Sequence, residues 1–442
     1  MIKSLGKVFN PTKAVSSLLD TGEETCVTFE FDHVQHYSTG LSITIAVVCY
    51  YNEGELHAAF TTDLDSLSKT IDEQADGFQH AYTNLIEALQ LSDINLKIPL
   101  KLDTGQIPKP WGREIWYTGI EERGICTIQG VPLPWILDAF ATIITGTKKL
   151  TPILLKILDP SPREVLGDLY FELHRQKREV YVVTHVDENA WSDSVGEIRL
   201  GFNPDIIDDY ADEQQFKDAY LTSVNNYRLV RDKIDNRLDE IRSEAQVAED
   251  GLVPAKTVSD WYSKIDPSLL TQEQHLREAM NLFTAKCSLQ VGDVIQVNPR
   301  VPHSLQHGVR VIEFQTPHYE RYILSFAQKV LTQNQWDTKE ALDQAQISSV
   351  GVTEIQQLSE TESLIADFEE FKVTRILLQP GTDETIDADH YCLVISVEGS
   401  LTLGKQQLLP EEGYYIPACA DPVAISNTGT QPATLLIAQP TQ

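Results

Sequence analysis

The sequence predicts a mainly β protein with a helical insertion and an added N-terminal α+β domain. Two observations lead to this fold class. Short runs rich in β-branched and aromatic residues, separated by turn residues, recur through most of the chain. Between about residues 208 and 287 they give way to segments with apolar residues three and four positions apart, a pattern typical of amphipathic helices.

The N-terminal α+β domain is expected over residues 1–100. The runs TCVTFEFDH, LSITIAVVCYY and ELHAAFTT predict strands. The following stretch, DLDSLSKTIDEQADGFQHAYTNLIEALQL, opens with capping residues and has helical spacing, so it predicts one helix.

The remaining chain is expected to form two β units with the helices between them. The first unit covers residues 101–207 and 288–345. In it PLPWILDAFATII predicts a helix, and TPILLKILD, DLYFELH and EVYVVTHV predict strands. The last two strands are separated by only a few residues, as the strands of a hairpin are. Residues 208–287 form the helical subdomain. Residues 346–442 form the second unit, where turn signals every eight to twelve residues are typical of a β-sandwich or barrel.

Composition excludes several classes of partner. The 65 acidic and 35 basic residues leave a net charge of −30 in 442 residues, which repels nucleic acid and anionic lipid. The six cysteines are scattered without a CxxC motif, as in proteins of a reducing compartment. The sequence shows no signal peptide and no apolar run of about eighteen residues, so a cytoplasmic protein is expected.

A candidate metal site follows from the spacing of acids and histidines. Residues two apart on a strand face the same side, so Glu172 and His174 share a face, and Glu179 begins the next strand. His303, in PRVPHSLQHGVRVIEFQT, supplies a further imidazole from a distant strand. Carboxylates and neutral imidazoles that converge in a β unit bind divalent metals. His185 is a competing ligand, and the alternative for each residue is an ordinary exposed strand position.

Landmarks in a fixed order resemble the type I mannose-6-phosphate isomerases, zinc enzymes of the cupin superfamily. In this chain the landmarks read KPWG, EIW, ILLKILD, LYFELH, KRE and GDVIQVNPRVPHSLQHGVRVIEFQTPHYER, over residues 109–321. The helical interruption before the last landmark also matches. The C-terminal block resembles the metal-free second barrel of that family, whereas residues 1–100 have no recognised counterpart.

The resemblance implies a fold of two cupin (jelly-roll) barrels and a divalent metal, zinc first, in the first barrel. The implied ligands are Glu172, His174, Glu179 and His303. The implied pocket residues are Trp111, Glu114, Lys156 and the substrate arginine, Arg321.

The implied reaction is that of an aldose–ketose isomerase in carbohydrate metabolism, acting on a sugar phosphate. Zinc polarises the substrate carbonyl, and a base moves a proton between C1 and C2 through a cis-enediol. Glu114 and a metal-bound water are both candidates for the base. The expected partner is a small sugar or sugar phosphate.

The chain departs from the family pattern in ways that leave alternatives open. Glu172 replaces a glutamine, which suits manganese or iron as well as zinc, and Tyr170 replaces a serine that helps to hold phosphate. The loop before Glu179 is cut to Arg175, Gln176 and Lys177; with Arg178, its basic residues form either a new phosphate contact or a solvated turn. The second hypothesis is therefore a catalytically inactive sugar-binding or sensing cupin protein, and a third is a structural cupin without metal.

Overall fold

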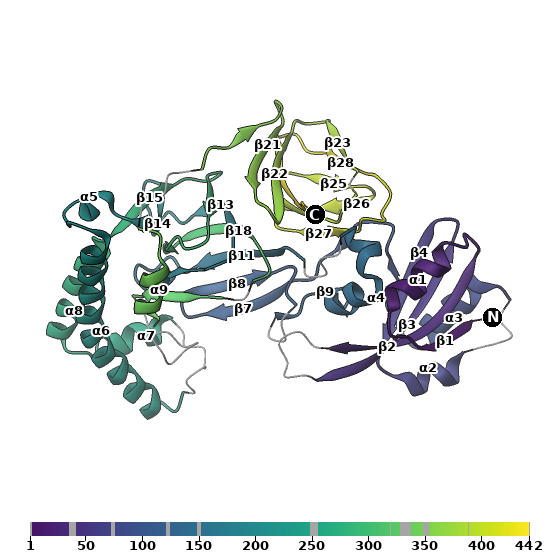
Figure 1. Cartoon of the computed structure of the whole chain (residues 1–442), viewed down its shortest axis with the longest axis horizontal. Coiled ribbons are helices and arrows are strands. Elements are labelled where there is room, and N and C mark those ends of the chain that lie inside the picture. The colour runs from purple at the N-terminus through teal and green to yellow at the C-terminus, as the bar shows by residue number, and fades with distance from the viewer. Residues whose placement is uncertain are drawn as a thin grey trace.

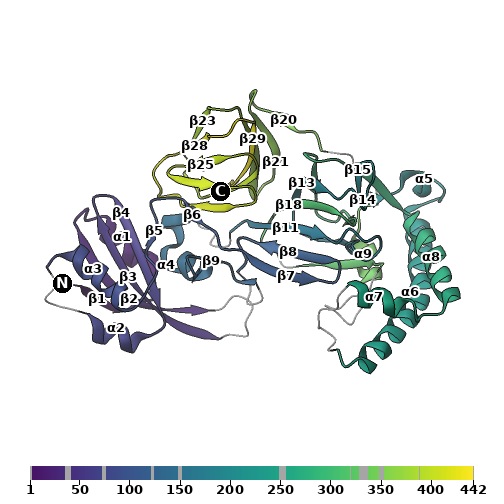
Figure 2. The ribbon, with the colours of Figure 1, turned by 180° about the vertical axis from the view of Figure 1, so that it is seen from behind.

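The computed structural model describes residues 2–34, 41–71, 76–120, 124–147, 152–247, 255–318, 320–327, 337–347, 353–387 and 389–441. Two β units lie at the centre, and a helical group and an N-terminal sheet lie at opposite ends in both views (Figure 1, Figure 2). The fold is mainly β, as the sequence predicts. Among the described helices, none is both long enough and apolar enough to cross a membrane.

The N-terminal part is a five-stranded sheet with helices on it. The sheet order is β1-β2-β3-β4-β5. Its strands are β1 (Lys3–Lys7), β2 (Thr25–Val34), β3 (Ser42–Asn52), β4 (Glu55–Thr61) and β5 (Ile94–Asn95). The helices are α1 (Pro11–Leu19), α2 (Leu64–Thr70) and α3 (Phe78–Ala88).

The single helix expected before residue 91 is wrong in the described residues. Helix α2 ends before Ile71, whose φ of −59° and ψ of 114° are not helical. Gly77, with a φ of 91° that glycine adopts without strain, immediately precedes α3. Helix α1 was not expected either. Asn10 caps it by accepting the backbone N–H of Lys13 at 2.9 Å, and Pro11 occupies the first turn.

The first β unit consists of two sheets packed face to face. The larger has the order β16-β13-β18-β11-β8-β7 and the smaller β15-β14-β17-β12-β19. The strands are β7 (Gly105–Lys109), β8 (Gly112–Trp116), β11 (Leu154–Pro160), β12 (Phe171–Leu173), β13 (Glu179–Val186), β14 (Gly196–Phe202), β15 (Thr284–Leu289), β16 (Val294–Val297), β17 (His303–Leu305), β18 (Val309–Gln315) and β19 (Tyr322–Ser325). Before them come β6 (Leu100–Lys101), the pair β9 (Thr127–Ile128) and β10 (Val131–Pro132), and helix α4 (Leu133–Thr145).

The C-terminal β unit repeats this arrangement. Its sheets have the orders β20-β21-β22-β29-β24-β27-β6 and β23-β28-β25-β26. The strands are β20 (Gln356–Gln357), β21 (Glu362–Asp367), β22 (Phe371–Leu378), β23 (Asp383–Ile386), β24 (Cys392–Glu398), β25 (Leu401–Leu403), β26 (Gln406–Leu408), β27 (Gly413–Ile416), β28 (Val423–Asn427) and β29 (Ala433–Pro440).

Neither β unit is a barrel closed by hydrogen bonds in the described part of the chain. Each is two separate sheets held together by apolar side chains between them, including Val183, Leu200 and Val311 in the first unit. The expected hairpin of DLYFELH and EVYVVTHV is also wrong. β12 pairs with β17 and β19, whereas β13 pairs with β16 and β18, so the short link between β12 and β13 crosses from one sheet to the other.

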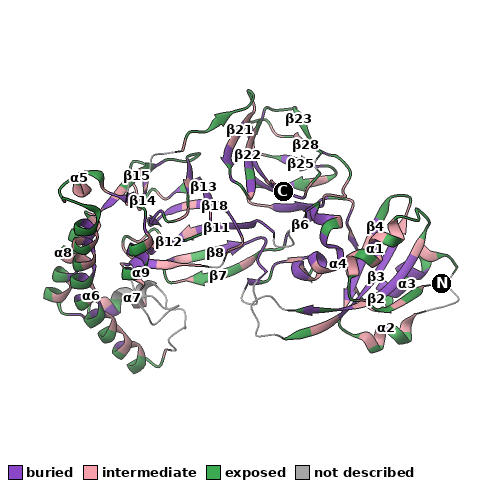
Figure 3. Cartoon of the chain, viewed as in Figure 1, coloured by how far each residue is buried: buried purple, intermediate pink, exposed green. Residues whose placement is uncertain are grey.

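The helices expected between residues 208 and 287 extend from the smaller sheet of the first unit. They are α6 (Glu213–Glu244), α7 (Ala255–Tyr262) and α8 (Pro267–Asn281). The short helix α5 (Pro204–Ile207) precedes this range, and α9 (Thr338–Gln344) lies beside β19. Phe216 and Tyr220 of α6 pack on Phe202 of β14 in one buried cluster. Long exposed stripes remain on α6 and α8 (Figure 3).

Helix α4 joins the N-terminal sheet to the β units. One core cluster includes Phe60 of β4, Phe140 of α4 and Ile157 of β11. The His33 ring on β2 is buried, and its Nδ1 lies 2.6 Å from Asp138 Oδ2 on α4. This polar contact therefore links β2 of the N-terminal sheet to α4.

We expect Asp138→Ala to lower the free energy of unfolding by about 1–3 kcal/mol, because His33 loses a charged partner in a buried place. Urea denaturation followed by circular dichroism measures this change. Glu87→Ala on the exposed face of α3 is the control and should change stability by less than about 0.5 kcal/mol. Equal stability of the two variants would contradict the role given to Asp138.

Candidate metal centre

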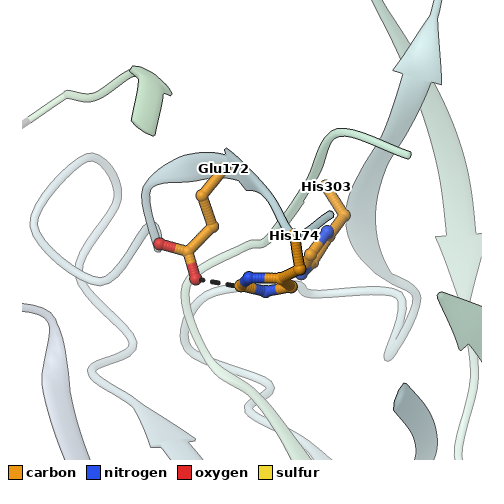
Figure 4. Close-up of side chains that lie close together, drawn as sticks. All are labelled: Glu172, His174 and His303. Carbon is orange, nitrogen blue, oxygen red and sulfur yellow. Dashed lines mark ion pairs between the residues drawn. The ribbon is translucent and has the colours of Figure 1, made fainter. Parts of the chain in front are cut away.

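Three of the predicted ligands converge between the two sheets of the first β unit. Glu172 on β12 and His303 on β17 are direct cross-strand partners, and His174 follows β12 immediately. One ligand atom from each of the three residues can be chosen so that all three atoms lie within 4.8 Å of one another. Figure 4 shows the Glu172 carboxylate directed at the His174 ring, with His303 beside it.

The His174 ring presents an unused nitrogen to this group. Its Nδ1 lies 2.7 Å from the backbone oxygen of Glu320 and donates to it, which leaves Nε2 as the lone-pair nitrogen. Nε2 is buried and has no hydrogen-bond partner among the described residues. It lies 3.9 Å from Glu172 Oε1 and 3.5 Å from Glu179 Oε1. Burial, followed by the charge of Lys177, holds the His174 pKa well below its usual value, so the ring is neutral.

The His303 ring faces a carboxylate in the same way. Its Nδ1 lies 3.1 Å from the Val301 backbone oxygen, and its Nε2 lies 3.1 Å from Glu179 Oε2. Burial alone would lower the His303 pKa, but the hydrogen bond and the charge of Glu179 outweigh it and raise the pKa. Nδ1 uses its hydrogen to donate to the Val301 carbonyl, and Nε2 faces the Glu179 carboxylate, which can only accept. Nε2 must therefore carry a second proton or bind a metal ion in place of that proton.

Glu179, the fourth predicted ligand, touches both histidines but is shared with other groups. Its Oε1 lies 2.5 Å from Lys177 Nζ, and its Oε2 accepts the Tyr181 hydroxyl at 2.8 Å. Burial would raise the Glu179 pKa, but the charge of Lys177 and the hydrogen bond from His303 hold it well below the usual value. Glu179 is therefore an ionised carboxylate that faces both histidines from the opposite sheet.

These donors fit a divalent metal. The Nδ1 atom of each histidine is held by a backbone carbonyl, and metal-bound imidazoles usually make such a hydrogen bond with the nitrogen that does not bind the metal. Two imidazoles with one or two carboxylates suit zinc, and the carboxylates also suit manganese or iron. His185, the competing ligand, lies exposed on β13 and does not join the group.

A cavity of about 60 Å³ opens beside the donors, and the predicted pocket residues line it. Those residues are Trp111, Glu114, Lys156 and Arg321. Three of the four predicted ligands, Glu172, Glu179 and His303, line the same cavity.

Glu114 lies in a tightly paired environment. Its Oε1 is 3.1 Å from Lys109 Nζ, and its Oε2 accepts Trp116 Nε1–H at 2.7 Å. Burial would raise the Glu114 pKa, but the charges of Lys156 and Lys109 outweigh it and lower the pKa. Lys156 itself donates to Gln315 Oε1 at 3.1 Å and lies 4.9 Å from the Trp116 ring centre.

Arg321, the predicted substrate arginine, contacts a predicted ligand. Its Nε lies 3.7 Å from Glu172 Oε2, and its guanidinium carbon lies 5.5 Å from the centre of the Tyr170 ring. The charge added by glutamate at position 172 therefore has a cationic neighbour.

Glu313 is a cavity residue that sequence reasoning missed. It lies on β18 opposite Lys156 on one side and Tyr181 on the other. Burial raises its pKa to about 8, although the charge of Lys156 opposes this shift. The signal was present in VIEFQ, where Glu313 and Gln315 stand two apart in an otherwise apolar strand and so share one face.

The basic cluster of the shortened link does not act as a unit. Lys177 reaches the candidate metal centre, whereas Arg175 lies 4.5 Å from the Tyr322 ring centre and Arg178 pairs with Glu370 at 3.1 Å. Glu320 holds the link in place. Its carboxylate accepts the backbone N–H groups of Gln176 and Lys177, and it lies 3.6 Å from Arg175 Nε.

We expect Glu320→Ala to weaken zinc binding by about 10–100-fold, because the link that carries His174 and Lys177 loses its anchor. Glu320→Gln keeps an oxygen acceptor and should restore most of the affinity. Competition with a coloured zinc chelator measures both variants. Equal affinity of wild type and Glu320→Ala would show that the carboxylate does not position the ligands.

Solved structures of mannose 6-phosphate isomerases share this fold. The enzyme from Bacillus subtilis is 15% identical, with 77% of this chain and 99% of that chain covered and a TM-score of 0.54. The apo form from Salmonella typhimurium is 16% identical, with 78% and 99% covered and a TM-score of 0.55. A zinc-bound mannose 6-phosphate isomerase is 14% identical, with 78% and 100% covered and a TM-score of 0.56. No protein-family model and no curated protein sequence matches the chain.

The sequence identity of these matches is low, so what they show is the fold. The resemblance seen in the ordered landmarks is confirmed at that level. Over 78% of its length the chain has the fold of the mannose 6-phosphate isomerases, as a divergent relative in structure.

Proposed function

We propose that the protein is a metal-dependent aldose–ketose isomerase of the cupin type that acts on a sugar or a sugar phosphate. One observation carries this proposal. Glu172 and His303, which form a compact group of candidate metal donors with His174, line the same cavity as Glu313, a buried carboxyl group whose pKa is raised to about 8. The fold shared with mannose 6-phosphate isomerases supports the same reaction class.

The metal would be held by Glu172, His174 and His303, with Glu179 as the fourth donor. When bound, it supplies a Lewis acid that polarises the sugar carbonyl. The chain supplies the rest of the chemistry: it orients the donors through the carbonyls of Glu320 and Val301 and places acids and bases around the cavity.

Glu313 fits the role of base better than Glu114. A base works best when its pKa lies near the working pH, and the Glu313 pKa of about 8 meets this condition. Glu114 is instead held ionised by Lys156 and Lys109, which makes its carboxylate a weaker base. Both side chains line the cavity, so either can reach a bound sugar.

The proton movements are those of an isomerisation without an external oxidant. Glu313 takes the proton from C2 of the aldose and returns it to C1, while the proton on O2 is transferred to O1. The sum is a ketose with the same atoms. Negative charge that develops on the sugar oxygens is stabilised by the ammonium group of Lys177, which also lines the cavity.

A second candidate function is sugar binding without catalysis. Lys177 already lies 2.5 Å from Glu179, and Arg321 lies 3.7 Å from Glu172, so protein cations neutralise both carboxylates of the donor set. Such internal pairing favours a site that is stable without metal.

Deuterium exchange at C2 separates the two functions. The zinc-loaded chain is incubated with aldoses and their phosphates in D₂O, and the C2 proton is followed by NMR. The isomerase predicts exchange that a chelator abolishes. Bound metal and bound sugar with no exchange on any compound would support the binding protein instead.

A further inference from the structure

Four basic side chains line the cavity within the described part of the chain, and three of them have a carboxylate partner there. Lys109 Nζ lies 3.1 Å from Glu114 Oε1. Lys177 and Arg321 contact Glu179 and Glu172. The side chains of the Lys109–Glu114 and Lys177–Glu179 pairs are at most 13% exposed, so these two ion pairs are largely withdrawn from water.

The fourth, Lys156, is buried between the acids on neighbouring strands. It donates to Gln315. Its charge lowers the pKa of Glu114, which lies on the neighbouring strand β8 two residues before Trp116, the residue opposite Lys156. Glu313 lies directly opposite it on β18. Lys156 therefore has acidic neighbours on both sides.

The basic residues next to the cavity are paired as well. Arg175 lies 3.6 Å from Glu320, and Arg178 lies 3.1 Å from Glu370. A phosphate contact was one of the two expectations for the basic residues of the link. Arg175 and Arg178 are instead paired with carboxylates of the same chain.

Binding of a metal leaves these pairs in place, because the ligand carboxylates offer different oxygens. Glu172 turns Oε1 toward His174 and Oε2 toward Arg321. Glu179 turns Oε2 toward His303 and Oε1 toward Lys177. A phosphate group at Lys109 or Lys177 would have to take the cation from a largely buried pair and leave the carboxylate unpaired, which is strongly unfavourable. At Lys156 it would meet the acids Glu114 and Glu313. The net charge of −30 adds to the repulsion.

Tyr170 offers a neutral contact instead. Its hydroxyl is buried and has no hydrogen-bond partner among the described residues, although the side chain lines the cavity. A phenol hydroxyl both donates and accepts, which suits a sugar hydroxyl. By the resemblance, Tyr170 stands where the family has a serine that helps to hold phosphate.

We infer that the sugar bound at this site carries no phosphate group, and that Tyr170 donates to or accepts from one of its hydroxyl groups. This inference rests on the proposed function in one respect, namely that the site binds a sugar. It concerns binding, so it stands or fails separately from catalysis.

The test compares mannose with mannose 6-phosphate, which differ only in the phosphate group, by calorimetric titration of the zinc-loaded full chain. Mannose 6-phosphate is expected to bind about tenfold more weakly than mannose. Tighter binding of the phosphate would overturn the inference, and so would binding of neither compound. Mannose binding without C2 exchange on any aldose or aldose phosphate would overturn the isomerase proposal alone.

Two variants locate the effect in the cavity. Glu172→Gln removes the partner of Arg321 and should raise the affinity for mannose 6-phosphate about tenfold relative to mannose, a gain that a further Arg321→Ala abolishes. Tyr170→Phe should weaken mannose binding about three- to tenfold and leave zinc affinity unchanged. If Tyr170→Phe binds mannose like wild type, the role of the hydroxyl is wrong.

Discussion

Replacing His174 by alanine is expected to lower the affinity for zinc by more than about 100-fold. The substitution removes a ligand itself, so the loss should exceed the 10–100-fold typical of changes in the outer shell. The reason is specific to this ring: its Nδ1 is fixed by the Glu320 carbonyl, and its buried Nε2 has no hydrogen-bond partner in the described structure. Chelator competition at neutral pH measures the affinity.

His185→Ala is the matched control, since it removes the same side chain from an exposed position on β13. It should bind zinc like wild type and keep the same thermal stability. Unchanged affinity of His174→Ala, or an equal loss in His185→Ala, would contradict the assignment of the ligands.

The second large effect is expected for Glu313→Gln, which should slow C2 exchange by about 10²–10⁴-fold, the usual contribution of a positioned base. The amide keeps the size of the side chain but cannot accept a proton at carbon. Zinc affinity should change little, because Glu313 is not among the ligands. The initial rate of exchange in D₂O, measured by NMR at saturating sugar, reports the change.

Glu114→Gln distinguishes the two candidate bases. Glu114 is held ionised by lysines, so its loss should reduce the rate much less than the loss of Glu313. The wild-type rate should also rise with pH through about 8, because Glu313 must lose its proton to act as a base. A larger loss in Glu114→Gln, or a rate that falls over this pH range, would give the role of base to another group.

The positions of the candidate metal donors could be predicted in part from sequence because they depend on local geometry. Strand alternation alone brings Glu172 and His174 toward one side, and the prolines around His303 mark the turn before β17. Their convergence depends on pairing between strands far apart in the chain. The expected hairpin was wrong because the length of a link does not show where its strands pair. A link of a few residues can join two paired strands or, as between β12 and β13, cross from one sheet to the other.

The charges around the site could not be predicted at all. The pairing of Arg321 with Glu172, and of Lys177 with Glu179, requires the distances between side chains on different elements. Glu313 was missed because an acid within a strand is more often exposed than buried. The register of β18 against β11 and β13 places it opposite Lys156 and Tyr181, where it lines the cavity.

The sequence predicted which regions form helices and which form strands better than it predicted where each helix begins and ends. The long amphipathic pattern gave α6, whose apolar side chains bury against β14. The N-terminal helices were divided wrongly because a glycine with positive φ begins α3 inside a continuous helical pattern. Separate sheets rather than closed barrels result from which edge strands pair, which one sequence does not reveal.

The most direct test of the central claim is a crystal structure of the zinc-soaked protein with anomalous data collected on both sides of the zinc absorption edge. A single peak is expected between Glu172, His174 and His303, with Glu179 as the fourth donor and distances of about 2.0–2.2 Å to nitrogen and oxygen. No peak at this place would contradict the metal centre and with it the proposed isomerase.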